Sequence, residues 1–385
     1  MAHDPEFDAD LQRPLPNDQQ EDEGDITGPV SFRDAIVISA DWTIETIFLQ
    51  IQKGNIDLEP KFQRRVAWDD VRRSRLIESI VVGMPVPNIV IAENKNQRNR
   101  FIVIDGKQRL AAICDFMQDS LELSGLDVRE DLNKKKFSQF SKEDQATFEN
   151  STIRASMIRN WRDDNFLYAI FYRLNSGSLP LSPQELRKAL IGGKLLSLIE
   201  SYISSSKPFQ EIFGAGLDKR MRDSELVLRF IAFDRGLEEY RGDFRKFLDN
   251  YTRYFEEEGD GREREANDSL SRLDAALAES FRIFKESAFK KWIGFRYERV
   301  INRAIFDCMT RFFADQTVRN YAVGKEKEIV NEFHLLCDDP IFRDAIEKTT
   351  KSLGATYRRI DMWGEALSSV LQLKYDHNKR RIVER

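Results

Sequence analysis

Cysteine and histidine are scarce in this chain, which has three of each among 385 residues. The cysteines stand far apart in apolar surroundings and show no C-x-x-C spacing, so the sequence argues against a disulfide or zinc framework. We expect Cys114, Cys308 and Cys337 to be reduced and packed, and we expect no structural metal.

Long apolar runs are also missing. No segment approaches the length of a membrane span, and the N-terminus has no signal-peptide pattern. These features predict a cytoplasmic protein that does not contact membranes. The Walker A pattern is absent as well, which argues against a P-loop ATPase.

The net charge of −5 is unevenly distributed along the chain. Residues 1–30 contain nine acidic residues and one basic residue, Arg13, together with several prolines. The rest of the chain has 59 basic and 56 acidic residues and is slightly basic. We predict a disordered acidic tail over residues 1–29, because such a composition cannot bury enough apolar surface to fold.

The remaining chain shows two patterns. Short β-branched runs first alternate with amphipathic segments, and from Asp164 onward the pattern is helical almost throughout. We therefore predict an α+β protein, with a mixed α/β domain over 30–200 and a helical bundle over 201–385. The acidic, glycine-containing segment 256–267 is expected to be a loop between helices. The predicted strands are 36–39, 88–92, 101–104 and 152–158.

The most informative segment begins at residue 101 and reads FIVIDGKQRLAAICDFMQ. A β-branched strand stops at Asp105 and Gly106, and helical apolar spacing follows Lys107, Gln108 and Arg109. Such a turn directs backbone N–H groups and a cationic side chain at one point, which suits phosphate. Arg109 and Lys107 are candidates to hold phosphate groups, and Gly106 allows close approach. We expect Arg109 to be exposed at the turn.

Two further clusters lie on either side of this turn in the sequence. PKFQRRVAW at 60–68 precedes a predicted helix over 69–82, which Asp69 or Asp70 would cap. FYRLNSG at 171–177 predicts a helix end, and a new helix is expected to begin near Pro183.

Each cluster also has a purely structural interpretation. An Asp-Gly pair before a helix is most often only its cap, Gln63 and Arg64 fit a surface pair, and Trp68 is more typical of a core. An Asn-Ser-Gly turn at Asn175 is an adequate helix stop without any function. The presence of all three clusters in this order is what favours a functional site.

Together these residues resemble the N-terminal domain family of GmrSD-type, modification-dependent restriction proteins, whose fold is similar to the ParB and sulfiredoxin nucleotide-binding domains. The resemblance covers residues from about 40 to 195. The chain departs from the family pattern by one extra residue between Gly177 and Leu181, and by Lys107 where the family usually has Gln. The matching residues are Pro60, Phe62, Gln63, Arg64 and Trp68, then Asp105, Gly106, Gln108, Arg109 and Leu110, and finally Phe171, Leu174, Asn175, Ser176, Gly177, Leu181, Ser182, Glu185 and Leu186.

The resemblance implies that a nucleoside triphosphate binds at the turn and is linked to DNA cleavage or to control of a nuclease. Asp105 would hold Mg²⁺ or orient a water molecule, since phosphoryl transfer needs positioning and charge neutralisation. The implied catalytic residues are Asp105, Gln108 and Arg109, and the implied nucleotide-binding residues are Gln63, Arg64, Gly106, Lys107 and Asn175.

Many relatives carry a second, HNH-type nuclease domain, which needs a histidine within a metal-binding ββα unit. His3, His334 and His377 have no such context, so we expect this chain to lack that domain. A ParB-like clamp is less favoured, because no helix-turn-helix signature stands out.

The helical half contains two patterns that recur in single-chain relatives. They run from Arg220 to Phe230 and from Asn302 to Asp307, and their helix-spaced Arg and Asp residues most often form structural ion pairs. The terminal Lys379, Arg380 and Arg381 are candidates to contact a DNA backbone, although a solvated tail is the simpler interpretation.

Three functions remain open. The first is a nucleotide-dependent, Mg²⁺-requiring DNA endonuclease or nickase of a prokaryotic anti-phage restriction system. The second is a nucleotide-binding regulator that leaves cutting to a separate nuclease or defence-system subunit. The third is a ParB-like DNA-binding protein switched by nucleotide. The sequence leaves the oligomeric state open and is compatible with a homo-oligomer.

Overall fold

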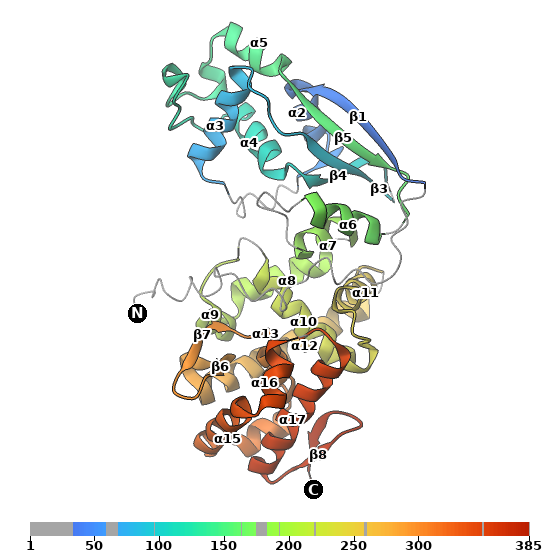
Figure 1. Cartoon of the computed structure of the whole chain (residues 1–385), viewed down its shortest axis with the longest axis vertical. Helices are drawn as coiled ribbons and strands as arrows, with labels where there is room; N and C mark the ends of the chain where they lie inside the picture. Colours follow the sequence, from blue (N-terminus) through green and yellow to red (C-terminus); the bar gives the residue numbers. More distant parts are fainter. Residues whose placement is uncertain are drawn as a thin grey trace. The chain divides into compact units, whose positions relative to one another are not determined.

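The computed structural model describes residues 34–58, 68–95, 97–162, 164–174, 183–191, 193–218, 221–257, 260–348 and 350–384. The predicted acidic tail over 1–29 lies outside these residues. The described residues form two compact units, one ending at Leu190 and the other beginning at Ile191. Figure 1 shows the elements of both units, coloured along the sequence.

A five-stranded mixed sheet forms the centre of the first unit. Its strands are β1 (Ile36–Thr43), β2 (Ile56–Asp57), β3 (Ile89–Asn94), β4 (Gln97–Asp105) and β5 (Thr152–Arg159). They lie in the order β1-β5-β3-β4-β2. The pairs β1-β5 and β3-β4 are antiparallel, whereas β3-β5 and β2-β4 are parallel. All four predicted strands are confirmed, and β2 is an additional short strand.

The interior strands β3 and β4 account for the continuous apolar runs in the sequence. Residues 89–92 of β3 and 101–104 of β4 are all buried. A strand that is covered on both faces reads as a continuous apolar run and not as an alternation. The buried half of β4 leads directly to Asp105.

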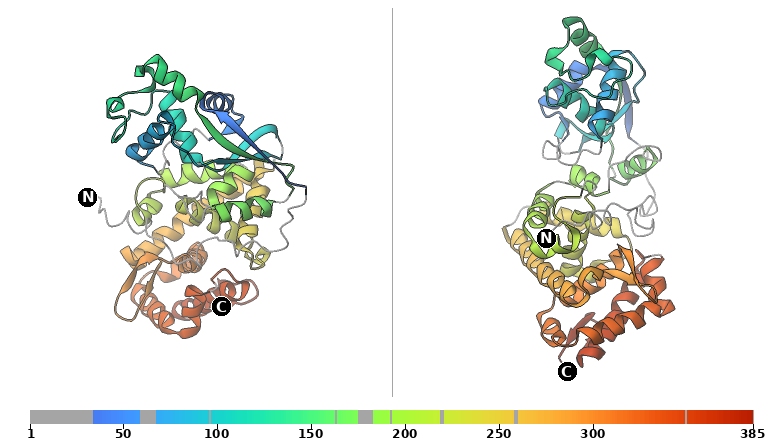
Figure 2. Two further views of the ribbon diagram at one scale, coloured as in Figure 1. Left: turned by 45° about the horizontal axis from the view of Figure 1, so that its top comes forward. Right: turned by 90° about the vertical axis from the view of Figure 1, so that its left-hand side faces the viewer.

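The described residues of this unit form six α-helices: α2 (Ile44–Gln52), α3 (Asp70–Val81), α4 (Lys107–Met117), α5 (Lys142–Asn150), α6 (Asp164–Leu174) and α7 (Pro183–Ile191). Helices α2 to α5 contact one another on one side of the sheet (Figures 1 and 2). Asp69 caps α3 by accepting a hydrogen bond from the Arg72 backbone N–H at 2.7 Å, as predicted. Helix α7 begins at Pro183, also as predicted.

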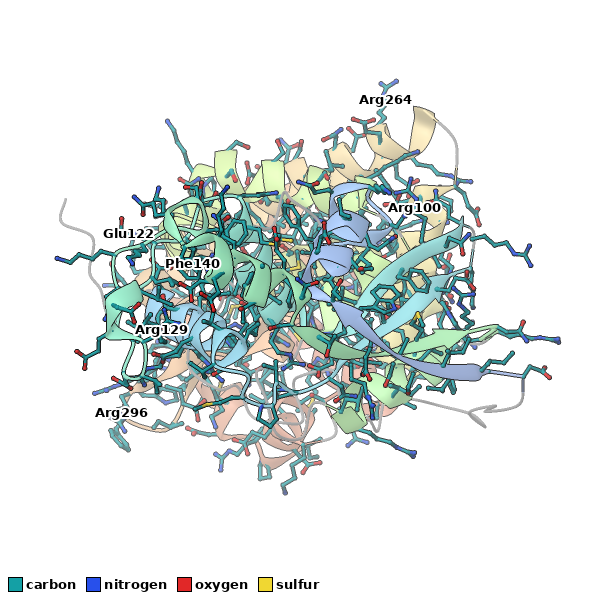
Figure 3. All side chains as sticks on the ribbon, turned by 90° about the horizontal axis from the view of Figure 1, so that it is seen from above. Arg100, Glu122, Arg129, Phe140, Arg264 and Arg296 are labelled. Atoms are coloured by element: carbon teal, nitrogen blue, oxygen red, sulfur yellow. The ribbon has the colours of Figure 1, made fainter. Side chains whose placement is uncertain are left out.

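Helix α4 is held in place by its apolar face. Leu110, Ile113 and Phe116 are fully buried. The Phe116 ring packs edge-on against Phe140, which is labelled in Figure 3, with ring centroids 5.1 Å apart, and against Phe148 at 5.4 Å. Burying each large aromatic side chain stabilises the fold by roughly 2–3 kcal/mol, so the first turn of α4 starts from a rigid helix.

The second unit is mainly helical, as predicted. Two antiparallel hairpins were missed, β6-β7 and β8-β9. The elements are α8 (Lys194–Ser205), α9 (Lys207–Phe213), α10 (Arg222–Gly236), α11 (Phe244–Glu256), α12 (Asp260–Phe284), β6 (Lys290–Trp292), β7 (Tyr297–Ile301), α13 (Arg303–Phe313), α14 (Gln316–Ala322), α15 (Glu326–Asp338), α16 (Pro340–Glu347), α17 (Leu353–Leu371), β8 (Lys374–Asp376) and β9 (Arg381–Val383).

The predicted loop over 256–267 is wrong for most of its length, because α12 already begins at Asp260. Its first turns are rich in Arg and Glu, which are good helix formers despite their charge. Ala266 is fully buried and anchors this end of α12 to the bundle.

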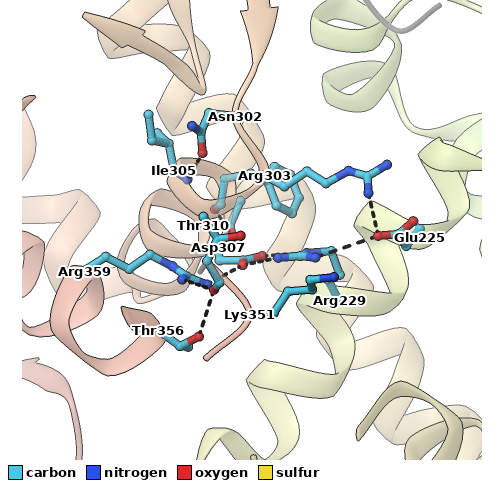
Figure 4. A network of polar contacts seen from close by, with 12 residues as sticks. Glu225, Arg229, Asn302, Arg303, Ile305, Asp307, Thr310, Lys351, Thr356 and Arg359 are labelled. Atoms are coloured by element: carbon cyan, nitrogen blue, oxygen red, sulfur yellow. Dashed lines mark hydrogen bonds and ion pairs between the residues drawn. The ribbon is translucent and has the colours of Figure 1, made fainter. Parts of the chain in front are cut away.

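A buried network of ion pairs joins α10, α13 and α17 (Figure 4). Arg229 donates two hydrogen bonds to the carboxylate of Asp307, one of them at 3.0 Å from Nε to Oδ1. Arg359 reaches the same carboxylate at 3.2 Å, and Arg303 pairs with Glu225 at 2.9 Å. Apart from Arg359, these residues come from the two recurring patterns, so the prediction of structural ion pairs is confirmed.

All three cysteines are free and buried, as predicted. Burial raises the pKa of each thiol to about 12. Among the described residues, no helix combines the length and the apolar composition needed to cross a membrane.

Candidate phosphate-binding turn

The turn between β4 and α4 requires glycine at residue 106. Gly106 has φ +97° and ψ +9°, a left-handed conformation that other residues adopt at a cost. A Cβ at this position would also lie 2.7 Å from Cγ2 of Ile89 on β3. Glycine is therefore fixed here by both backbone conformation and space, and the chain passes from strand to helix within one residue.

Arg109 lies inside the turn and not on its surface. Its side chain is 9% exposed. Its Nη2 donates to Oδ2 of Asp105 at 2.8 Å and to the backbone carbonyl of Asn88 at 3.0 Å, while its buried Nε has no hydrogen-bond partner. The prediction of an exposed Arg109 is wrong, because one turn of helix brings its guanidinium back over the end of β4. Arg109 thus ties Asp105 to the start of β3.

The first turn of α4 begins directly after Asp105 and Gly106. Among the described residues, no side-chain hydrogen bond caps the helix at Gly106, and the first turn itself contains no acidic residue. The partial positive charge of a helix N-terminus and its backbone N–H groups attract phosphate. Lys107 and Gln108 are both half-buried in this turn. The turn therefore combines a helix N-terminus with the charge of Lys107.

Asp105 is the acidic residue of this turn. Its side chain is 25% exposed, and Oδ1 takes no part in the bond to Arg109. Within the described residues, no group of three or more His, Cys, Asp or Glu side chains is placed to hold a metal ion. One carboxylate oxygen fits Mg²⁺, because this ion usually keeps several waters and takes its other ligands from substrate phosphates.

The remaining predicted site residues are distributed as follows. Gln63, Arg64 and Asn175 lie outside the described residues. Trp68 is only half-buried, with the Arg72 guanidinium 4.6 Å from its ring centroid, so it is not a full core residue.

The predicted DNA-contacting residues lie on the C-terminal hairpin and not on a loose tail. Arg380 lies 3.7 Å from the ring centroid of Tyr357 and pairs with Asp361 at 3.2 Å. Lys379 and Arg381 are exposed.

Sequence reasoning missed an open basic groove of about 550 Å³ at the other end of β3 and β4. Lys95, Arg98 and Arg159 line it together with Trp161. Lys95 lies 4.4 Å from the Trp161 ring centroid, and the buried Nε of Arg159 has no hydrogen-bond partner. The polar, basic run NKNQRNR over 94–100 was the available signal, but it cannot indicate that Arg159 of β5 lies beside it.

The fold and the turn define an α+β domain in which strand β4 passes directly into helix α4 at Gly106. Residues 44–192 match the family model described as the GmrSD restriction endonuclease, N-terminal domain. The resemblance drawn from the motifs is thereby confirmed for this segment, which links the protein to restriction systems. No curated protein and no solved structure matches the chain.

Proposed function

We propose that the first unit binds a nucleoside triphosphate at residues 105–109 and uses it to drive DNA cleavage in a restriction system. The observation that carries this proposal is the turn itself. Gly106 places Asp105 of β4 beside the uncapped N-terminus of α4, in a conformation that only glycine fits without strain.

Each residue of the turn has a distinct role in this proposal. The N-terminus of α4 and Lys107 bind the phosphates, and Gly106 lets them approach the backbone. Arg109 is a positioning residue, because its guanidinium already holds the Asp105 carboxylate and the Asn88 carbonyl. Asp105 directs Oδ1 to Mg²⁺, which supplies charge neutralisation when it is bound.

The basic groove is the candidate surface for DNA. Lys95, Arg98 and Arg159 lie around one hollow of the same sheet that carries the turn. Neutralising phosphates with such side chains releases counterions, so binding there weakens steeply with salt. This arrangement would connect nucleotide and DNA through the rigid strands β3 and β4.

The test is to incubate the full chain with supercoiled plasmid and Mg²⁺, with and without each nucleoside triphosphate. Nicking and phosphate release are measured together. Arg109→Lys keeps the charge but loses the planar fork, so both activities should fall by about tenfold or more. Arg98→Ala should weaken plasmid binding and leave phosphate release without DNA unchanged.

The outcomes separate the functions. Nicking that depends on nucleotide and falls in Arg109→Lys supports the proposal. Phosphate release without nicking would contradict a self-contained nuclease and favour the regulator of a separate nuclease. If neither nucleotide hydrolysis nor nucleotide binding occurs, the assignment of the turn is wrong.

A further inference from the structure

A second cavity, of about 360 Å³, lies within the helical unit. It is far from the proposed turn in sequence and is enclosed by α10, α12, α13, α14 and the C-terminal hairpin. Its walls carry aromatic rings, four arginines and three carboxylates. The residues that matter are Phe230, Phe233, Phe312, Arg272, Arg311 and Arg381.

The carboxylates that line the cavity already have hydrogen-bond or ion-pair partners. Asp234 binds Arg272 and accepts a hydrogen bond from Ser269 at 2.6 Å. Asp307 belongs to the buried ion-pair network described above. Asp315 caps α14 by accepting from the Thr317 backbone N–H at 2.8 Å. None of these three carboxylates pairs with Arg311, Arg380 or Arg381, the three remaining arginines of the wall, and Arg380 pairs with Asp361.

Arg311 is a partly buried cation whose guanidinium is held by backbone carbonyls. Nε donates to the carbonyl of Arg380 at 3.1 Å and Nη2 to the carbonyl of Lys379 at 3.2 Å. In the part of the chain that the structure describes, Nη1 donates no hydrogen bond and no carboxylate lies within ion-pair distance of this guanidinium. Burial, followed by the like charge of Arg381, lowers the pKa of Arg311. Arg311 and Arg381 thus line one cavity, and among the described residues neither forms an ion pair, although the charges of Asp234 and Glu238 act on Arg311 from a greater distance.

Holding a cation without an ion-pair partner in a partly buried site is costly, and the cost is offset when an anion binds. Arginine forks suit phosphate oxygens. The volume falls within the usual range of small-molecule sites, which is roughly 300–1,000 Å³. Phe230, Phe233 and Phe312 are almost fully buried and contribute an apolar part of the wall.

We propose that this cavity is a second ligand site, which binds a small phosphorylated compound, with Arg311 and Arg381 holding the phosphate. Arg311 is fixed by the hairpin carbonyls, and Arg381 closes the site from β9. A ligand here would tie the hairpin to α13, so occupancy would stabilise the C-terminal end of the unit.

The test is calorimetric titration of the full chain with three probes: AMP, inorganic phosphate and a 5′-phosphorylated DNA hexanucleotide. The titration is repeated with Lys107→Ala, which addresses the turn of the first unit. Arg381→Ala removes one phosphate-binding group of the cavity. Lys379→Ala is the matched control, because it removes one positive charge from the same hairpin but does not line the cavity.

AMP should bind with the same affinity to the wild type, Lys107→Ala and Lys379→Ala, and about tenfold or more weakly to Arg381→Ala. It should also bind more tightly than inorganic phosphate, since only AMP extends beyond the phosphate to contact the rest of the cavity wall. The proposal is overturned if neither AMP nor phosphate binds saturably at millimolar concentration, or if Arg381→Ala binds AMP like the wild type. Binding of the hexanucleotide without binding of AMP overturns it in favour of a nucleic-acid surface.

Discussion

Replacing Gly106 by alanine tests whether the strand-to-helix turn is as constrained as its geometry indicates. A non-glycine residue in a left-handed conformation costs about 1–2 kcal/mol. The new Cβ would also meet Cγ2 of Ile89 at 2.7 Å, and Ile89 is fully buried and cannot move aside. Overpacking of a core typically costs a further 1–3 kcal/mol. We expect Gly106→Ala to destabilise the sheet by roughly 2–5 kcal/mol.

Gly83→Ala is the matched control. Gly83 has φ +74°, but a Cβ there has no neighbour within 4 Å. Gly83→Ala should therefore cost only the backbone contribution of about 1–2 kcal/mol. Native-state hydrogen exchange of the β3 and β4 amides measures the local opening free energy of both variants. Equal losses in the two variants would refute the argument that Ile89 and Gly106 are in close contact.

Two further predictions concern the buried groups of the chain. Asp307→Asn should lower the free energy of unfolding of the helical unit by about 3–5 kcal/mol, because Arg229 and Arg359 lose a buried counter-charge. Asp344→Asn, at an exposed pair with Lys348, should cost less than about 1 kcal/mol, and similar losses in both would contradict the buried network. The three thiols, with pKa values raised to about 12, should resist aromatic disulfide reagents at pH 8 until the chain is unfolded. Because the unfolded thiols ionise from about pH 9, their contribution to stability is complete below that pH and is lost towards pH 12, which urea titrations across this range will detect.

Much of the fold could be predicted because its signals are local. The apolar runs at 89–92 and 101–104 form the buried parts of β3 and β4, two interior strands of the sheet. The helical spacing after residue 109 continues α4. The hairpins β6-β7 and β8-β9 could not be recognised, since strands of three to five residues are too short to show a period of two.

The candidate site was predictable in its residues but not in their arrangement. The motif identified Asp105 to Arg109, yet the burial of Arg109 depends on the carbonyl of Asn88, which is 21 residues away in the sequence. The basic groove likewise depends on the register that places the end of β5 beside the β3-β4 connection. Such long-range contacts have no periodic signal in a single sequence.

The most direct test of the central claim is a calorimetric titration of the full chain with Mg²⁺ and each nucleoside triphosphate, comparing Lys107→Ala with Lys142→Ala. Both lysines are the first residue of a helix, and Lys142 is exposed at the start of α5. If the N-terminus of α4 holds the phosphates, Lys107→Ala should weaken triphosphate binding by about tenfold or more, and Lys142→Ala should bind like the wild type. Equal triphosphate affinity in the wild type and Lys107→Ala would contradict the claim.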